Sequence, residues 1–190
     1  MKSGIKLFSV FVITLLLLSS CSSMLHTNKA LEENKTRSGN KLTSSAPKDD
    51  SQMAKLKKAE KEADEAGRAI LETGRKMALE EKVIIKGSCW NWVNECFKRA
   101  GYGTEKYIAY KSKKTGPYVD IDKIEPGDWI YYINYSYNKV EHSGIFVYWV
   151  DKKKKIGVTL SYGGEHRKEP GRYREYLLKD VYYITRAGKK

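Results

Sequence analysis

Four runs of β-branched and aromatic residues follow one another in the second half of the chain, and short polar turns join the first three. Such runs are typical of β-strands, and a short turn joins neighbouring strands that run antiparallel. Helical patterns precede them, over residues 53–82 and 89–100. We therefore expect an α+β domain in which N-terminal helices are followed by an antiparallel β-sheet. The expected strands are residues 129–133, 142–150, 156–162 and 181–184.

The first helical segment is rich in Ala, Glu, Lys and Leu, and its apolar stripe is discontinuous. Gly67 and Gly74 are poor helix formers, so we expect them to break it. Residues 103–122 have no strong periodicity and contain the turn-forming pair Gly116-Pro117. This segment is predicted to be a loop that could line a cleft.

A shorter helix is predicted after the Gly87-Ser88 pair, which places Cys89 in its first turn. The unpaired N–H groups and positive dipole end of a first turn stabilise a thiolate. Cys96 lies two turns further, about 10.5 Å along the axis, so the two thiols cannot form a disulfide within one helix. We expect chemistry at Cys89 and packing at Cys96. The alternative is that both cysteines are small core residues.

The first fifty residues differ in composition from the rest. Lys2 and Lys6 precede an apolar run at residues 7–18, which is too short to span a bilayer. The run closes with Leu18-Ser19-Ser20-Cys21, which resembles the lipobox of bacterial lipoproteins. The resemblance implies a signal peptide at residues 1–20, a lipid on Cys21, and an exported protein anchored to a membrane of the cell envelope, inner or outer. An uncleaved hydrophobic anchor is the alternative.

Residues 21–51 consist mainly of small, polar and charged residues, a composition that does not offset the entropy of ordering. They are predicted to form a flexible tether, which leaves residues 52–190 for the folded domain. The formal net charge of the chain is +13. This charge favours anionic surroundings, either cell-wall polymer or lipid head groups, although it also fits a merely solvated surface. Export and the lack of a basic-aromatic motif argue against a nucleic-acid partner.

A cysteine nucleophile needs a base, and histidine suits this role because its pKa lies near neutrality. His26 belongs to the predicted tether, which leaves His142 and His166. The ordered motifs Gly87-Ser88-Cys89, Pro126-Gly127-Asp128-Trp129 and His142-Ser143-Gly144 resemble those of NlpC-type cell-wall cysteine peptidases. The resemblance implies a papain-like domain that hydrolyses peptidoglycan peptides, with Cys89 as nucleophile, His142 as base, and a cleft between the helices and the sheet.

The sequence departs from the family pattern around the cysteine. The family usually has Asp before the cysteine and Ser-Gly after it, whereas Ser88 precedes Cys89 and Trp90-Asn91 follow it. Bulky residues after the cysteine are common in the related CHAP amidases, so the cleaved bond stays open between peptide and amide. Trp90 and Trp129 could bind substrate, although most aromatic residues of such strands belong to the core.

In the family, a third residue that orients the histidine lies on the strand after the histidine strand. A hairpin turn centred near Lys153 would place His142 opposite roughly Gly164. The nearby candidates are Ser161, Tyr162, Glu165 and His166, of which we favour Ser161 or Tyr162. No spacing of Cys, His and carboxylates typical of a zinc site is present, and no metal or cofactor is expected.

Three functions fit these features. The first is a membrane-anchored thiol hydrolase that cleaves amide or peptide bonds in peptidoglycan. The second is an inactive binding or scaffolding lipoprotein on the same fold, because the family pattern around Cys89 is incomplete. The third is a papain-like enzyme that hydrolyses or transfers lipid acyl groups. The oligomeric state is not indicated by the sequence.

Overall fold

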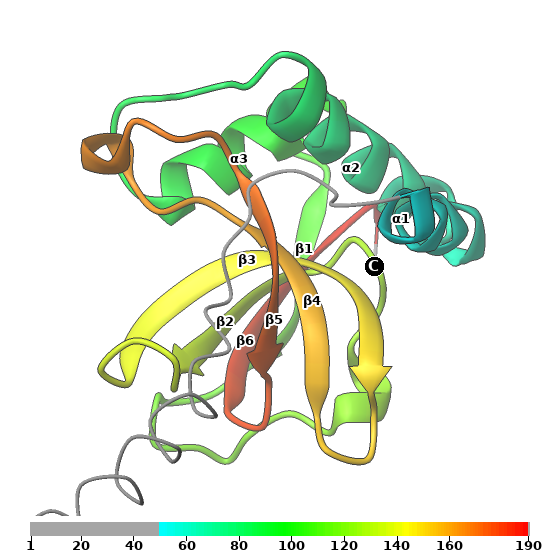
Figure 1. Cartoon of the computed structure of the whole chain (residues 1–190). Coiled ribbons are helices and arrows are strands. Elements are labelled where there is room, and N and C mark those ends of the chain that lie inside the picture. Colours follow the sequence, from blue (N-terminus) through cyan, green and yellow to red (C-terminus); the bar gives the residue numbers. More distant parts are fainter. Residues whose placement is uncertain (1–49, 190) are drawn as a thin grey trace, which may run out of the picture. The chain divides into compact units, whose positions relative to one another are not determined.

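The computed structural model describes residues 50–189. Helices come first and pack on a six-stranded antiparallel sheet, so the expected order of helices and sheet is confirmed (Figure 1). The helices are α1 (Asp50–Glu62), α2 (Glu65–Arg75), the π-helical turn η1 (Lys76–Glu80) and α3 (Cys89–Arg99). The strands are β1 (Lys106–Lys111), β2 (Trp129–Asn134), β3 (Val140–Asp151), β4 (Ile156–Ser161), β5 (Arg172–Leu177) and β6 (Val181–Ala187).

The predicted signal peptide at residues 1–20, the lipidation residue Cys21 and most of the predicted tether at residues 21–51 lie outside the described residues. Within residues 50–189, no helix is both long enough and apolar enough to cross a membrane.

The break between α1 and α2 lies at Ala63-Asp64, so the prediction that Gly67 and Gly74 interrupt the helix is wrong. Asp64 caps α2, since its Oδ1 accepts the Gly67 N–H at 2.6 Å. The glycines permit close packing instead. A Cβ on Gly67 would lie 2.4 Å from the Pro126 carbonyl oxygen, and one on Gly74 would lie 2.7 Å from Leu160 Cδ2.

The strands are arranged in the order β1-β6-β2-β3-β4-β5, with every pair antiparallel. Two of them, β1 and β5, were not expected from the sequence, and the predicted loop at residues 103–122 is wrong where it contains β1. Both are edge strands. Strand β1 has no buried residue, and β5 carries the charged sequence Arg-Tyr-Arg-Glu-Tyr-Leu, so neither shows the apolar pattern of a central strand.

The β3–β4 hairpin has nearly the predicted register. Asp151 faces Ile156 across the turn, and Ile145 faces Leu160 after two irregularities in the ladder. Because β4 ends at Ser161, His142 lies beyond the paired part of this hairpin and faces no β4 residue. Its partner on the other side is Tyr132 of β2.

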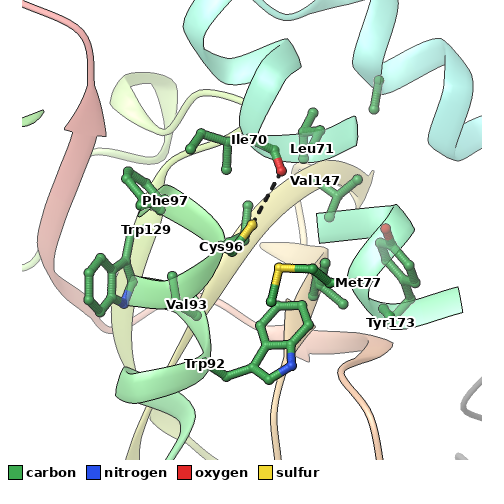
Figure 2. Close-up of a cluster of buried hydrophobic side chains, with 14 of the residues drawn as sticks. Ile70, Leu71, Met77, Trp92, Val93, Cys96, Phe97, Trp129, Val147 and Tyr173 are labelled. Carbon is green, nitrogen blue, oxygen red and sulfur yellow. Dashed lines mark hydrogen bonds between the residues drawn. The ribbon is translucent and has the colours of Figure 1, made fainter. Parts of the chain in front are cut away.

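The larger of two apolar cores lies where the helices pack on the sheet (Figure 2). Cys96 is fully buried in this helix-facing core, and its Sγ lies 3.5 Å from the Ile70 carbonyl oxygen. Burial raises the pKa of the Cys96 thiol far above its usual range. Both described cysteines are free, so the packing role expected of Cys96 and the lack of a disulfide are confirmed.

A second core gathers side chains of the sheet and of the loop before β2. Alternation along β2 separates the two cores, because Trp129 belongs to the helix-facing core whereas Ile130 and Tyr132 belong to the second core. The members of the second core are Val119, Ile124, Ile130, Tyr132, Phe146, Tyr176, Leu178, Val181 and Ile184.

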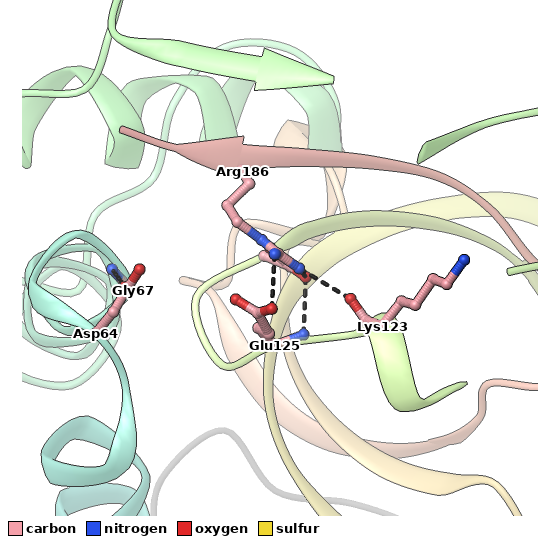
Figure 3. A network of polar contacts seen from close by, with 6 residues as sticks. Asp64, Gly67, Lys123, Glu125 and Arg186 are labelled. Atoms are coloured by element: carbon pink, nitrogen blue, oxygen red, sulfur yellow. Dashed lines mark hydrogen bonds and ion pairs between the residues drawn. The ribbon is translucent and has the colours of Figure 1, made fainter. Parts of the chain in front are cut away.

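The Pro126-Gly127-Asp128 turn is a structural junction. Asp128 is 1% exposed, accepts the Glu125 N–H at 2.8 Å, and receives two hydrogen bonds from the Arg186 guanidinium at 2.8 and 2.9 Å. Figure 3 shows Arg186 reaching from β6 to this turn, where it also donates to the Lys123 carbonyl. A Cβ on Gly127 would lie 2.4 Å from Gly67 Cα, so glycine at both positions lets the turn touch α2.

Candidate active site

Cys89 is the first residue of α3, as predicted, and a reciprocal cap fixes the start of this helix. Ser88 Oγ accepts the Trp90 N–H at 3.3 Å, and Asn91 Oδ1 accepts the Ser88 N–H at 2.9 Å. Gly87 has φ +112°, and a Cβ there would lie 2.4 Å from Asn91 Oδ1. Ser88 and Asn91, which differ from the NlpC-type pattern around the cysteine, therefore form the cap that positions Cys89.

Cys89 is partly buried beside tyrosines of the sheet. Burial raises the pKa of Tyr131, Tyr132 and Tyr182, and the negative charge of a Cys89 thiolate raises each of them further. The thiol therefore lies within electrostatic reach of β2 and β6. Its neighbour Trp90 is 46% exposed and packs on Trp129, with ring centroids 5.6 Å apart.

His142 is partly buried between two tyrosine rings of the second core. Its ring centroid lies 5.7 Å from that of Tyr132 and 6.0 Å from that of Tyr176. Tyr132 is thus a shared neighbour, because its ring contacts His142 and its hydroxyl senses the charge of Cys89. Within residues 50–189, neither Cys89 nor any other side chain forms a hydrogen bond with the His142 ring.

The pKa of His142 is lowered from 6.5 to about 4, first by burial and then by the positive charges of Arg172, Arg167 and Arg174. The imidazole is therefore neutral at neutral pH and has a nitrogen free to accept a proton. The same environment disfavours a resting pair of thiolate and imidazolium, since the imidazolium would face three cations.

The two favoured candidates for a third catalytic residue, Ser161 and Tyr162, have other partners. Ser161 Oγ lies 3.3 Å from the Tyr176 hydroxyl, and Tyr176 in turn contacts His142. Tyr162 donates to the Ile85 carbonyl at 2.9 Å and stacks on Trp92 in the helix-facing core. His166 is exposed in the short helix η3 (Glu165–Arg167). The structure therefore connects Ser161 to His142 through Tyr176, and it places Tyr162 in a different environment.

The two tryptophans expected to bind substrate differ in accessibility. Trp129 is only 2% exposed, beneath Trp90 and against Phe97, so it supports the site from within the core and the expectation of substrate contact is wrong for it. Trp90 alone of the pair offers an accessible ring beside Cys89.

Several residues at the site were missed from the sequence, namely Tyr176 and the arginines around His142. Arg172, Arg174 and Tyr176 recur at every second position of β5, and this spacing would have placed them on one face had the segment been recognised as a strand. The part of the chain that the structure describes contains no group of His, Cys, Asp and Glu able to hold a metal ion.

Comparisons of the chain with protein-family models, with curated proteins and with solved structures gave no match. The resemblance to NlpC-type peptidases therefore stays a prediction that rests on the order of the motifs.

Proposed function

We propose that this chain is an envelope-anchored thiol hydrolase with a papain-like domain that cleaves amide or peptide bonds in peptidoglycan. The observation that supports it most is a thiol at a capped helix start whose charge acts on Tyr132, the same tyrosine whose ring lies beside the neutral imidazole of His142. The lipobox-like sequence at Cys21 supports a place in the envelope, and the basic charge suits anionic wall polymer.

In the proposed reaction, His142 takes the Cys89 proton as the sulfur attacks the carbonyl carbon of the scissile bond. The Cys89 backbone N–H, a first-turn donor without an acceptor in its own helix, stabilises the oxyanion. The protonated His142 then gives its proton to the leaving amine, which leaves a thioester on Cys89. Water deprotonated by His142 cleaves this thioester and restores the thiol.

The low pKa of His142 fits transfer of the proton during attack rather than before it. An imidazole that is neutral at rest can accept a proton as the thiolate forms, although a base of such low pKa is weak. Proton transfer therefore depends on close approach of the two groups when substrate binds, because hydrogen bonds of such sites are often long before binding.

The test is digestion of purified peptidoglycan by the wild type and by Cys89→Ala, His142→Ala and Cys96→Ala. We expect soluble fragments from the wild type and Cys96→Ala, and rates at least about a hundredfold lower from the other two variants. Cys96→Ala is the matched control because it removes a thiol outside the site. Release of the same fragments by all four proteins at similar rates would contradict the proposal.

A second candidate, an inactive binding lipoprotein, is favoured by one observation. His142 has no hydrogen-bond partner among the described side chains to orient it, as the third residue of a catalytic triad would. Alkylation of Cys89 at neutral pH separates the two functions. Fast modification that His142→Ala suppresses supports the hydrolase. A rate like that of an ordinary free thiol, unchanged in His142→Ala, supports the binding protein.

A further inference from the structure

Three arginines lie around His142 from two different segments, and we call Arg167, Arg172 and Arg174 the arginine cluster. All three charges act on the His142 ring. Arg172 and Arg174 share the face of β5 that also carries Tyr176, because these residues alternate along the strand. Arg167 comes from η3, and a Cβ on Gly163 would lie 2.5 Å from Arg167 Cδ and 3.3 Å from an Arg172 guanidinium nitrogen.

Two members of the arginine cluster, Arg172 and Arg174, have too few acceptors. The Nε atoms of Arg172 and Arg174 are both buried without a hydrogen-bond partner. Arg172 pairs with Glu169 at 2.6 Å, whereas Arg174 has no carboxylate partner within residues 50–189. Burial and the charge of Arg174 also lower the pKa of Arg172. Shielded guanidinium groups that repel each other destabilise the fold, so the presence of two of them at one place points to a ligand of opposite charge.

The surroundings of the cluster suit an oxyanion. Across the ladder, Arg172 is paired with Ser161 and Arg174 with Thr159, whose hydroxyl groups lie 3.3 Å from the hydroxyls of Tyr176 and Tyr132. Guanidinium groups bind carboxylate and phosphate oxygens through two parallel N–H bonds, a geometry that lysine cannot provide.

The cluster also adjoins the start of the Cys89 helix. The Glu165 N–H donates to the Gly87 carbonyl at 2.9 Å, which ties the segment carrying Arg167 to the residue before Ser88. The segment that carries Arg167 therefore lies against the residue before Ser88, and the charges of all three arginines act on His142.

We propose that Arg172 and Arg174, with Arg167 at the edge, bind a carboxylate of the peptide that Cys89 cleaves. This inference rests on the proposed function, and it names the substrate as a peptide with a free carboxylate near the scissile bond. Inorganic phosphate and a phosphorylated wall polymer share the oxyanion chemistry, so the experiment must separate them from the carboxylate.

The experiment measures binding by calorimetry in the full-length chain carrying Cys89→Ala, which cannot turn over its ligand. The probes are soluble peptidoglycan stem peptides with free carboxylates, the same peptides with amidated carboxylates, and inorganic phosphate. Arg172→Gln and Arg174→Gln are compared with Lys153→Gln, which removes an equal charge at the exposed β3–β4 turn. We expect each arginine variant to bind the acidic peptide about tenfold more weakly and Lys153→Gln to bind it within about twofold of the parent.

Amidated peptides should bind to the Cys89→Ala parent about tenfold more weakly than the acidic peptide does. This loss should match the loss that the arginine variants show with the acidic peptide. Thermal unfolding gives a second readout, since Arg174→Gln should be at least as stable as its parent if the unpaired cation is kept for a ligand. Equal binding of acidic and amidated peptides, unchanged binding in both arginine variants, or tighter binding of phosphate than of the acidic peptide would overturn the assignment.

Failure of the proposed function would look different from failure of this inference. A chain that binds the acidic peptide through its arginines but whose Cys89 is unreactive and releases no fragments would keep the carboxylate site and lose the hydrolase. A chain that releases fragments with unchanged binding in the arginine variants would keep the hydrolase and lose the carboxylate site.

Discussion

His142 has a pKa set by its neighbours, and under the proposals made above these neighbours link the base to the ligand. Burial between Tyr132 and Tyr176 disfavours the imidazolium, and the arginine cluster disfavours it further. A carboxylate bound to Arg172 and Arg174 would offset part of the positive charge, so it would raise the pKa of His142 back toward 6.5. Under this proposal, the base becomes stronger when substrate is present.

The low pKa of His142 predicts that the fold loses stability in mild acid. Unfolding returns this pKa from about 4 to 6.5, so the unfolded chain binds more protons between these pH values and stability falls as the pH is lowered through them. At pH 4.5, the wild type should lose about 2 kcal/mol more of its pH 7 unfolding free energy than His142→Gln loses. Urea denaturation at both pH values measures the difference.

Arg174→Gln is the informative companion to that experiment. Removal of one repelling cation should raise the pKa of His142 and so reduce the loss of unfolding free energy in acid. Lys153→Gln should lose as much unfolding free energy as the wild type. If the unfolding free energy of the wild type and that of His142→Gln change by the same amount between the two pH values, then the pKa of His142 is not lowered in the folded protein.

Among the secondary-structure elements, those with a strong local signal were predicted and the edge strands were not. Apolar runs marked the strands β2, β3, β4 and β6, and the polar tip at Asp151–Lys155 set the hairpin register to within about two residues. Strands β1 and β5 depend on pairing with β6 and β4, a tertiary effect that no local pattern encodes. The glycines of α2 were misread because their close contacts with Pro126 and Leu160 are long-range.

At the candidate site, too, features with a local sequence signal were predicted and features that depend on long-range contacts were not. Cys89 at the start of α3 could be predicted because helix periodicity and the Gly-Ser pair are local. The surroundings of His142 could not, because Tyr176 and two of the arginines come from the unrecognised strand β5. Trp129 was misassigned since an aromatic residue at a strand start has the same sequence pattern whether it is buried or exposed.

The junction between β6 and the Pro126-Gly127-Asp128 turn predicts unequal effects of two carboxylates that share Arg186. Asp128 is buried and doubly bonded to the guanidinium, whereas the Glu125 side chain is 53% exposed and 2.7 Å from it. Asp128→Asn should lower the unfolding free energy by about 3 kcal/mol or more, because it leaves a shielded cation without its partner. Glu125→Gln should lower the unfolding free energy by about 1 kcal/mol or less. Denaturant titration compares them, and similar losses would contradict a buried, dominant Asp128 pair.

At the scale of the whole described domain, residues 50–189, two apolar cores lie on either side of one sheet, and the candidate site lies where they meet. Cys89 begins the helix whose buried face belongs to the helix-facing core, whereas His142 borders the second core. The η3 segment is hydrogen-bonded to Gly87, and the Tyr132 ring lies beside His142 while its hydroxyl is within electrostatic reach of Cys89. A change in the packing of either core can therefore alter the distance between Cys89 and His142.

The net charge of +13 acts over a longer range than the arginine cluster, and salt separates the two effects. Raising the ionic strength from about 0.01 M to about 1 M shortens the Debye length from about 30 Å to about 3 Å, which screens exposed lysines far more than the partly buried Arg172 and Arg174. Over this rise in ionic strength, the affinity of the full-length Cys89→Ala chain for insoluble anionic wall, measured by cosedimentation, should fall at least tenfold more than its affinity for the soluble acidic peptide. Equal salt dependence of the two would mean that surface charge alone, rather than the arginine cluster, accounts for peptide binding.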